Sequence, residues 1–406
     1  MVPMITRRTL LSLSAAYVAQ PLFSNVRIQE LEARISKRDF RGISKEDLPT
    51  PCMVLEIDKF ERNLQKMATH SKTTGINVRP HVKIHKCVEV SKRQMALGAI
   101  GVCCATMAEA EMVSSAGIKG SLLTCQPAGR NKIQRTAALA KKDPTFQCVV
   151  DDPITAALLE EAAEAEKTSI NVGVDVFAGL TRQGCQPGQK ALELSQKINS
   201  SKHLKLAGFM GYSGDASHTH GFAARKKKSA EHLSGLMETV AMARKSGLPV
   251  GFVTGGSTGT YNIDVGSLTE LQAGSYIYMD TAYVGVGGQS NDHIYEDWEP
   301  ALTVLTTVVS RTRHQQCTID AGNKAMLRVT DEVKGRPSVK IENQGAEYGL
   351  LLWSESDREI KLGERVEIYP TNLDTSVNVY DRVFVTRGEN VIDVWSIMGR
   401  TGAPQR

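Results

Sequence analysis

Two stretches of the sequence carry residues suited to covalent and anion-binding chemistry. Lys83 ends a β-rich run, residues 77–83, within Arg79-Pro80-His81-Val82-Lys83. A loop rich in glycine and hydroxyl residues, 255–260, follows the β-rich run 250–254. A desolvated lysine near cationic neighbours has a lowered pKa and can form an imine with an aldehyde. A glycine-rich loop can cradle a phosphate with its backbone N–H groups. Together the two stretches predict an aldehyde cofactor that carries a phosphate.

Eight β-rich runs alternate with helical patterns over most of the chain, after a first strand at residues 53–57. The eight runs are residues 77–83, 100–104, 120–125, 146–150, 170–175, 204–212, 250–254 and 268–274. The helical patterns include residues 106–116, 132–142, 153–167, 188–199 and 222–245. Because parallel strands need crossover helices and eight such units can close, we predict an α/β fold with a TIM-type (β/α)8 barrel over residues 45–295. An open doubly wound sheet is the alternative, although no Gly-x-Gly-x-x-Gly fingerprint follows the first strand.

The predicted barrel brings several polar residues to one end. Catalytic groups of such barrels come from the carboxyl ends of the strands. Lys83 ends the first of the eight strands, Asp175 the fifth and Tyr212 the sixth, and loop 255–260 follows the seventh. We therefore expect these residues to lie around one mouth of the barrel.

The pattern changes near residue 303. Short β-rich runs joined by turns, with little helix, follow at residues 304–310, 317–320, 365–369, 381–386 and 391–395. This pattern predicts a small β domain over residues 300–400, appended to the barrel.

The first 26 residues differ from the rest of the chain. Arg7-Arg8 precedes the apolar stretch 12–18, which is too short to span a bilayer. Paired arginines before a short apolar segment resemble a twin-arginine export signal. We expect a periplasmic protein that is not held in a membrane. The cytoplasm is the alternative, because the eight cysteines look like buried free thiols.

The formal net charge of +5 comes from scattered residues. The densest basic run, Arg225-Lys226-Lys227-Lys228, lies in a helical pattern with few aromatic residues. We expect this run to be a solvated helix face and not a nucleic-acid site.

Several motifs along the chain occur together in a known order. They are Asp47-Leu48-Pro49-Thr50-Pro51, Arg79-Pro80-His81-Val82-Lys83, Gly255-Gly256-Ser257-Thr258-Gly259-Thr260, Glu270-Leu271-Gln272-Ala273-Gly274-Ser275-Tyr276, Asp320-Ala321-Gly322 and Asp393-Val394-Trp395. In this order they resemble the alanine-racemase-like (fold type III) pyridoxal-phosphate enzymes, in the branch of D-threonine aldolase and D-serine dehydratase. The resemblance runs from about residue 48 to 400. It implies a barrel of the alanine racemase N-terminal kind and a D-serine dehydratase-like β domain.

The resemblance also implies roles for individual residues. Lys83 would hold pyridoxal 5'-phosphate as a Schiff base, with Lys86 as the alternative lysine. The phosphate would be held by Gly255, Gly256, Ser257, Thr258 and Tyr276. Arg182 resembles the arginine that faces the phenolic oxygen of the cofactor, although the spacing is two residues longer than usual. Tyr212 and His218 fall beside the cofactor. Imidazole titrates near neutral pH, so His218 is the candidate acid/base, with a solvent-facing loop histidine as the alternative.

The resemblance to this branch also implies activation by a metal. The ligands in such enzymes are a His-x-Asp or His-x-Cys pair in the C-terminal domain. The matching positions here are Asn372 and Asp374. Both side chains offer oxygen, which suits Mg²⁺ or Mn²⁺ and not zinc. The alternative is that both are turn residues, a position that their side chains favour.

The function implied is cleavage of a D-3-hydroxy amino acid, such as D-threonine or 3-hydroxy-D-aspartate, to glycine and an aldehyde. The alternatives are β-elimination of the D-serine dehydratase type, racemization, and cofactor binding without catalysis. The resemblance also implies a small-molecule D-amino acid as substrate and a homodimer.

Overall fold

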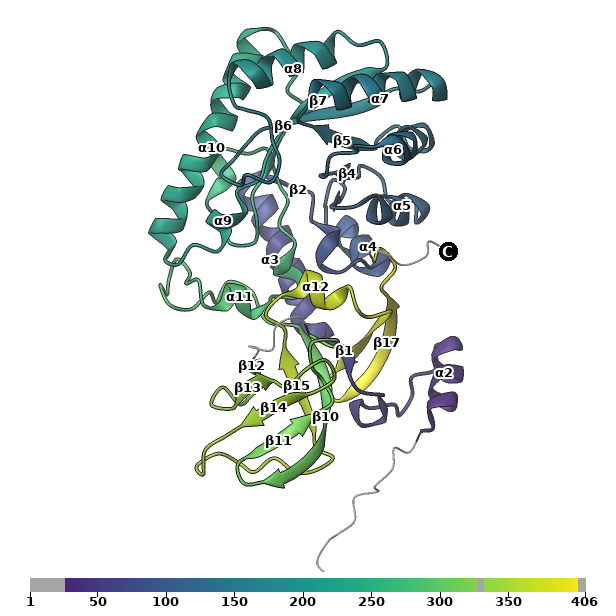
Figure 1. Cartoon of the computed structure of the whole chain (residues 1–406), viewed down its shortest axis with the longest axis vertical. Helices are drawn as coiled ribbons and strands as arrows, with labels where there is room; N and C mark the ends of the chain where they lie inside the picture. The colour runs from purple at the N-terminus through teal and green to yellow at the C-terminus, as the bar shows by residue number, and fades with distance from the viewer. Residues whose placement is uncertain (1–25, 327–331, 401–406) are drawn as a thin grey trace, which may run out of the picture.

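Eight short parallel strands form the first sheet, and they match the eight β-rich runs expected from the sequence (Figure 1). In the order of the sheet they are β2 (Asn77–Val78), β9 (Glu270–Leu271), β8 (Phe252–Gly255), β7 (Leu204–Gly211), β6 (Ile170–Asp175), β5 (Gln147–Val150), β4 (Leu122–Leu123) and β3 (Cys103–Cys104). A bridge between His81 and Cys103 joins the two outermost segments of this sheet. The predicted barrel is therefore confirmed, and the open-sheet alternative is wrong.

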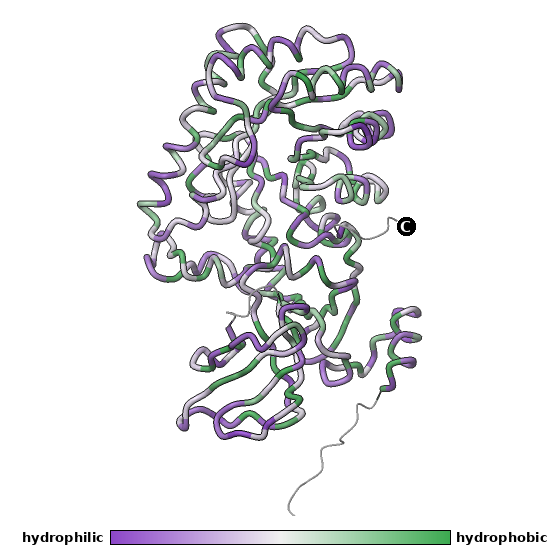
Figure 2. Tube along the Cα trace, in the orientation of Figure 1, coloured by the Kyte–Doolittle hydropathy of each residue, from purple (hydrophilic) through white to green (hydrophobic). Residues whose placement is uncertain are grey.

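Helices cover the outside of the barrel, and local sequence signals set their ends. They are α3 (Ile57–Thr74), α4 (Val88–Ala96), α5 (Met107–Ser115), α6 (Arg130–Lys142), α7 (Pro153–Glu166), α8 (Gln189–Asn199) and α10 (Phe222–Lys245). Asp152 caps α7 by accepting hydrogen bonds from two backbone N–H groups, and Pro153 stands at the first helical position. Gly75, with φ of 76°, ends α3 in the left-handed conformation that glycine adopts readily. Figure 2 shows hydrophobic and hydrophilic residues alternating along these helices, as expected for elements with one buried face.

One of the eight expected strand–helix units is incomplete. Between β8 and β9 the chain forms a 3-10 turn, Asp264–Gly266, in place of an α-helix. This connection contains Gly256, Gly259 and Gly266, and glycine disfavours helix. The helix α3, which precedes the first barrel strand, packs against the turn Ser275–Ile277 that follows β9. The chain thus supplies a covering helix at this point from its N-terminal side.

Nine strands form the second sheet. They are β1 (Cys52–Glu56), β10 (Leu302–Arg313), β11 (Gln316–Ile319), β12 (Glu332–Val333), β13 (Lys340–Asn343), β14 (Gly349–Leu352), β15 (Arg365–Tyr369), β16 (Arg382–Arg387) and β17 (Asn390–Ser396). Five of them match the C-terminal β-rich runs. The strand expected at 53–57 lies within the predicted barrel segment 45–295, but in the structure this strand, β1, pairs with β10 and β16. This N-terminal strand therefore completes the C-terminal domain.

The computed structural model describes residues 26–326 and 332–400. The expected export segment, residues 1–26, lies outside this range except for Val26. The short helix α2 (Ile28–Ser36) packs its buried Leu31 into an apolar cluster with Phe384 of the second sheet. Within the described ranges, no helix is both long and apolar enough to cross a bilayer. All eight cysteines are free, and most are buried, as expected.

The basic run on α10 is only partly solvated. Lys226 and Lys227 are exposed, as expected for a solvated helix face. Arg225 is fully buried, so the expectation was wrong for this residue.

The remaining short helices lie close to the junction of the two domains. They are α9 (Gly214–Ser217), α11 (Thr281–Val284) and α12 (Leu373–Val377). Figure 1 shows α11 and α12 between the barrel and the second sheet. The backbone N–H of Thr281 donates to the carbonyl of Pro370, which ties the end of the barrel segment to the C-terminal domain. The second domain therefore forms one wall of the barrel mouth.

Candidate active site

Lys83 lies in a single 3-10 turn, Val82–Ile84, at the carboxyl end of β2. The His81 ring caps this turn, because its Nδ1 accepts a hydrogen bond from the Lys83 backbone N–H at 3.4 Å. The half-buried Lys83 Nζ lies 3.3 Å from Asp374 Oδ2 of α12. Burial disfavours its ammonium form, but Tyr212 and Asp374 outweigh burial and raise the pKa of Lys83. The lowered pKa expected from cationic neighbours is therefore wrong, because Tyr212 and the carboxylate of Asp374 favour the ammonium form of Lys83.

Lys86 is buried, and its amine is hydrogen-bonded to the backbone. Its residue is 4% exposed, and its Nζ donates to the backbone carbonyls of Lys83 and Asp374. Its own carbonyl accepts a hydrogen bond from the N–H of Met398. Lys86 thus ties the lysine turn to the C-terminal domain, and its amine is occupied. Of the two lysines, Lys83 is the one that can reach a ligand.

The loop after β8 has the properties of an anion cradle. Residues 252–260 are all buried. The loop carbonyls turn toward the protein: those of Gly255, Thr258 and Gly259 accept hydrogen bonds from other segments. In the part of the chain that the structure describes, the backbone N–H groups of Gly256, Thr258 and Gly259 donate to no protein acceptor. Buried N–H groups are almost always paired, so three such donors in one loop fit a bound phosphate.

Gly256 makes this loop conformation accessible. Its φ is +70°, a region that side chains rarely adopt, and a Cβ there would lie 2.9 Å from a methyl of Leu271. The Ser257 hydroxyl lies 3.1 Å from that of Thr260, which holds the far side of the loop. Both the backbone conformation and the contact with Leu271 therefore favour glycine at position 256.

Lys83 and this loop face the same mouth. The sheet order β2-β9-β8 places them two strands apart, and neighbouring strands are spaced by 4.7–4.9 Å, so their backbones are separated by about 10 Å. The side chain of lysine covers part of that distance. A cofactor with an aldehyde and a phosphate on one small ring fits the remaining gap.

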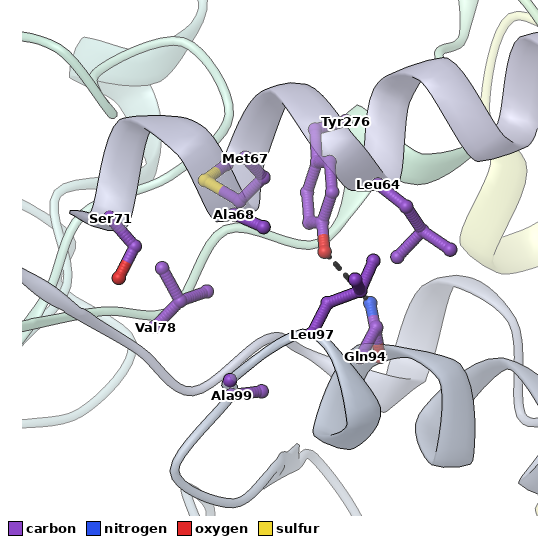
Figure 3. A pocket seen from close by; sticks show the side chains of 10 residues that line it. Leu64, Met67, Ala68, Ser71, Val78, Gln94, Leu97, Ala99 and Tyr276 are labelled. Atoms are coloured by element: carbon purple, nitrogen blue, oxygen red, sulfur yellow. Dashed lines mark hydrogen bonds between the residues drawn. The ribbon is translucent and has the colours of Figure 1, made fainter. Parts of the chain in front are cut away.

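Tyr276 differs from its expected role. Its side chain is 2% exposed and points away from the loop, and its hydroxyl accepts a hydrogen bond from Gln94 Nε2 at 3.1 Å. Figure 3 shows this hydroxyl in a small apolar pocket that also includes Leu64 and Met67. The Tyr276 backbone N–H donates to Thr258 Oγ1 at 2.9 Å. Tyr276 therefore supports the loop from behind, and its phenol group does not reach a phosphate there.

Tyr212 and Arg182 lie together beside Lys83. Tyr212 directly follows β7, and the Arg182 guanidinium lies 5.6 Å from the centre of the Tyr212 ring. Arg182 is exposed, and its charge opposes the protonation of Lys83. Both side chains are in the position to border a ring held by Lys83.

His218 follows α9 and is solvent-exposed, as its alternative role required. Its ring nevertheless packs against Tyr283, with 4.4 Å between ring centroids. Burial on that side lowers the pKa of His218 and is the largest effect. The Ala282 backbone opposes this shift, the charge of Lys83 adds to it, and Asp374 opposes it least. His218 is therefore a neutral imidazole at neutral pH that can accept a proton.

The expected metal residues do not form a metal site. The Asn372 side-chain oxygen caps α12, because it accepts hydrogen bonds from the N–H and the hydroxyl of Thr375. The Asp374 carboxylate pairs with Lys83. Among the described residues, no three His, Cys, Asp or Glu side chains gather as ligands. The donor set does not fit a resident divalent cation, and the turn alternative describes Asn372 correctly.

Two features of the site were missed by the sequence analysis. Asp280, at the start of α11, is 6% exposed and its Oδ1 has no hydrogen-bond partner among the described residues. Burial raises the pKa of Asp280 to about 7. Arg79 and Glu270, both in the recognised motifs, form a buried ion pair at 2.9 Å between β2 and β9. The motif around Lys83 thus has two roles: it positions the lysine, and through Arg79 it joins two neighbouring strands of the barrel.

Both domains of this chain match known protein families. Residues 55–282 match the alanine racemase N-terminal domain, and residues 301–386 match a domain described as "Putative serine dehydratase domain". A 3-hydroxy-D-aspartate aldolase of Paracoccus denitrificans is 33% identical, over 88% of this chain and 94% of its own. A D-threo-3-hydroxyaspartate dehydratase of a Delftia species is 25% identical, over 80% and 90%.

A solved structure resembles both domains together. The crystal structure of D-threonine aldolase from Filomicrobium marinum superposes with a TM-score of 0.85 at 34% identity, covering 88% of this chain and 98% of that one. Families of this fold type imply pyridoxal phosphate, which suits the lysine and the unpaired N–H donors described above. The chain belongs to the alanine-racemase-like (fold type III) family, in the branch of the D-threonine aldolases and D-serine dehydratases.

Proposed function

We propose that this protein is a pyridoxal-phosphate-dependent lyase that cleaves a D-3-hydroxy amino acid to glycine and an aldehyde. The observation that carries the proposal is that Lys83 and loop 255–260 lie at the same mouth of the barrel. The lysine can bind an aldehyde, and the N–H groups of the loop that lack acceptors can bind a phosphate. The aldolases among its relatives, at 33–34% identity over both domains, support the reaction type. D-Threonine and 3-hydroxy-D-aspartate are the substrates that we propose first.

Different residues of this chain bind the cofactor and transfer the proton. The bound cofactor supplies an electron sink for the bond broken at Cα. Lys83 anchors the aldehyde of the cofactor, and loop 255–260 binds its phosphate. His218 accepts the β-hydroxyl proton as the Cα–Cβ bond breaks, so that Cβ leaves as an aldehyde and Cα takes up a proton to give glycine.

We propose the reaction without a metal-dependent step. The sequence predicted assistance by Mg²⁺ or Mn²⁺ through Asn372 and Asp374. Asn372 is engaged as a helix cap, and among the described residues Asp374 belongs to no group of three His, Cys, Asp or Glu side chains that could hold such a cation. A metal-independent activity is the consequence.

The test is a product assay with D-threonine and D-serine. Glycine plus acetaldehyde from D-threonine is the expected result. Ammonia plus a 2-oxo acid would instead establish β-elimination, the second candidate, which the Delftia dehydratase favours. No turnover at full cofactor occupancy, with or without Mn²⁺, would leave a cofactor-binding protein without catalysis.

The assembly and the location of the protein are also proposals. We propose a homodimer, as in the related fold type, and export through the twin-arginine-like segment 1–26. Sedimentation of the purified protein tests the first. Fractionation of cells that express the full chain, compared with a variant in which Arg7 and Arg8 are replaced by lysine, tests the second.

A further inference from the structure

Arg225 is the most unusual charged residue outside the site described above. It lies in the first turns of α10, and its exposed fraction is 0%. Its guanidinium donates to four backbone carbonyls: Nε to Gly259 at 2.8 Å, Nη1 to Thr219 at 3.0 Å and to Val286 at 3.1 Å, and Nη2 to Gly287 at 2.7 Å. One side chain therefore holds three separate segments together.

The charge of Arg225 has no direct counter-ion. No carboxylate of the described residues lies within ion-pair distance of it, and Asp297 and Asp292 act on it only from further away. The guanidinium lies 5.4 Å from the ring centre of Tyr295 and 5.8 Å from that of Phe222, which are favourable but uncharged neighbours. Burying a cation without a carboxylate partner is costly. A positive charge near the N-terminus of a 24-residue helix adds an unfavourable interaction with the helix dipole. The four carbonyls and the two rings hold the guanidinium in place, but they leave its net charge without an anion.

One of the four carbonyls belongs to the cofactor loop. Gly259 turns its carbonyl to Arg225, while the N–H groups of Gly256, Thr258 and Gly259 remain without an acceptor. Asp264 also lies behind this loop, and its Oδ1 accepts the Ser229 hydroxyl at 2.7 Å. Burial raises the pKa of Asp264. The loop therefore has a buried cation without a carboxylate partner behind it and N–H donors without acceptors in front.

We propose that Arg225 is a positioning residue for the cofactor phosphate, and that the bound phosphate dianion is the missing counter-charge of its buried guanidinium. The inference rests on the proposed cofactor. It assigns to Arg225 two effects: orientation of the Gly259 peptide, and a favourable electrostatic potential at the loop without direct contact with the ligand.

The experiment compares two ligands and two variants of the full-length apoprotein. Pyridoxal 5'-phosphate and pyridoxal differ only in the phosphate, so the ratio of their dissociation constants, followed by absorbance, measures recognition of the phosphate. Arg225→Gln keeps two N–H donors but removes the charge, whereas Arg225→Lys keeps the charge and three N–H donors. Arg244→Gln, at the exposed far end of the same helix, is the matched control.

We expect Arg225→Gln to weaken pyridoxal 5'-phosphate by about 10- to 100-fold, the range produced by charges several ångströms apart at an effective dielectric constant of about 20. Pyridoxal affinity should change little, and Arg225→Lys and Arg244→Gln should keep the preference for the phosphorylated ligand. An equal loss for both ligands, or equal behaviour of the Gln and Lys variants, would overturn the proposal.

Two further outcomes are decisive. Should Arg225→Gln fail to fold, as judged by circular dichroism, Arg225→Met takes its place as the variant without charge: a weaker preference for pyridoxal 5'-phosphate than in Arg225→Lys supports the proposal, and equal preferences overturn it. A wild-type protein that binds neither ligand would overturn the proposed function itself. A wild-type protein that binds both, with a ratio unaffected by the Gln variant, would overturn only the role of Arg225.

Discussion

The two walls of the barrel mouth differ in how their polar groups are satisfied. On the barrel side, the N–H groups of Gly256, Thr258 and Gly259 are buried without acceptors. On the side of the C-terminal domain, Asn372 caps a helix and Asp374 pairs with Lys83. A wall with unpaired donors is suited to a ligand, because a buried N–H group without an acceptor costs free energy. A wall with satisfied groups positions its neighbours. The barrel therefore binds, and the second domain orients.

The largest expected effect comes from the residue that both walls contact. Lys83→Ala should abolish the absorbance band of lysine-bound cofactor and reduce glycine release from D-threonine by about 10³-fold or more, because the covalent anchor is lost. Visible absorbance and a coupled aldehyde assay measure the two effects. Lys86→Met is the control: its amine serves backbone carbonyls, so the band should remain. Loss of the band in Lys86→Met alone would reverse the assignment of the two lysines.

His218 is the next test, because it belongs to the barrel wall but not to the cradle. His218→Gln should lower kcat by about 10²-fold, the usual contribution of a positioned base, and leave cofactor absorbance unchanged. The pKa of His218 is lowered, so its neutral, proton-accepting form persists below the ordinary value of 6.5. Wild-type activity should therefore fall only as the pH drops below about 6.5.

The same pH limb should be missing in the variant. His220→Gln, two residues away and also exposed, is the control and should behave as the wild type. A pH profile of kcat that is identical in the wild type and His218→Gln would remove the histidine from the reaction.

Gly256→Ala tests the cradle itself. The new methyl would occupy a left-handed backbone position, which costs about 1–2 kcal/mol, and would press on Leu271. We expect cofactor affinity to fall about tenfold, together with a lower melting temperature. Gly363→Ala has nearly the same φ, +78°, but open space around it in the C-terminal domain. It should lose similar stability and keep cofactor affinity, and equal affinity losses in both variants would show that strain alone was measured.

Most of the barrel wall was predictable from the sequence, because strand ends set the positions of residues in this fold. Lys83, Tyr212 and the loop after β8 lie where the run of eight strands placed them. The change from alternating strands and helices to short strands near residue 303 also coincides with the start of β10 at Leu302. A parallel barrel leaves few other arrangements for such a pattern.

The remaining features depend on contacts that sequence spacing does not encode. Strand β1 joins the second sheet through partners that lie some 250 and 330 residues further along the chain. The burial of Arg225 within a lysine-rich run depends on which side of α10 faces the loop carbonyls. Tyr276 belongs to a recognised motif, but motif membership does not tell which way its side chain points. The pKa of Lys83 depends on Asp374, which comes from another domain.

The smallest effect concerns the second wall and decides whether it only orients. Asn372→Ala should lower the free energy of unfolding by about 1 kcal/mol, the typical contribution of a helix cap, and EDTA should not change the activity of the wild type. Asn372→Asp keeps an oxygen that can cap the helix and should restore stability. Asn372→His recreates the His-x-Asp pair, so activity should then respond to Mn²⁺.

Thermal unfolding measures the role of Asn372 as a helix cap, and assays with and without EDTA measure any role as a metal ligand. Loss of wild-type activity in EDTA that Mn²⁺ or Mg²⁺ restores would mean that the second wall binds a cation despite its paired groups, and that the two walls share the chemistry.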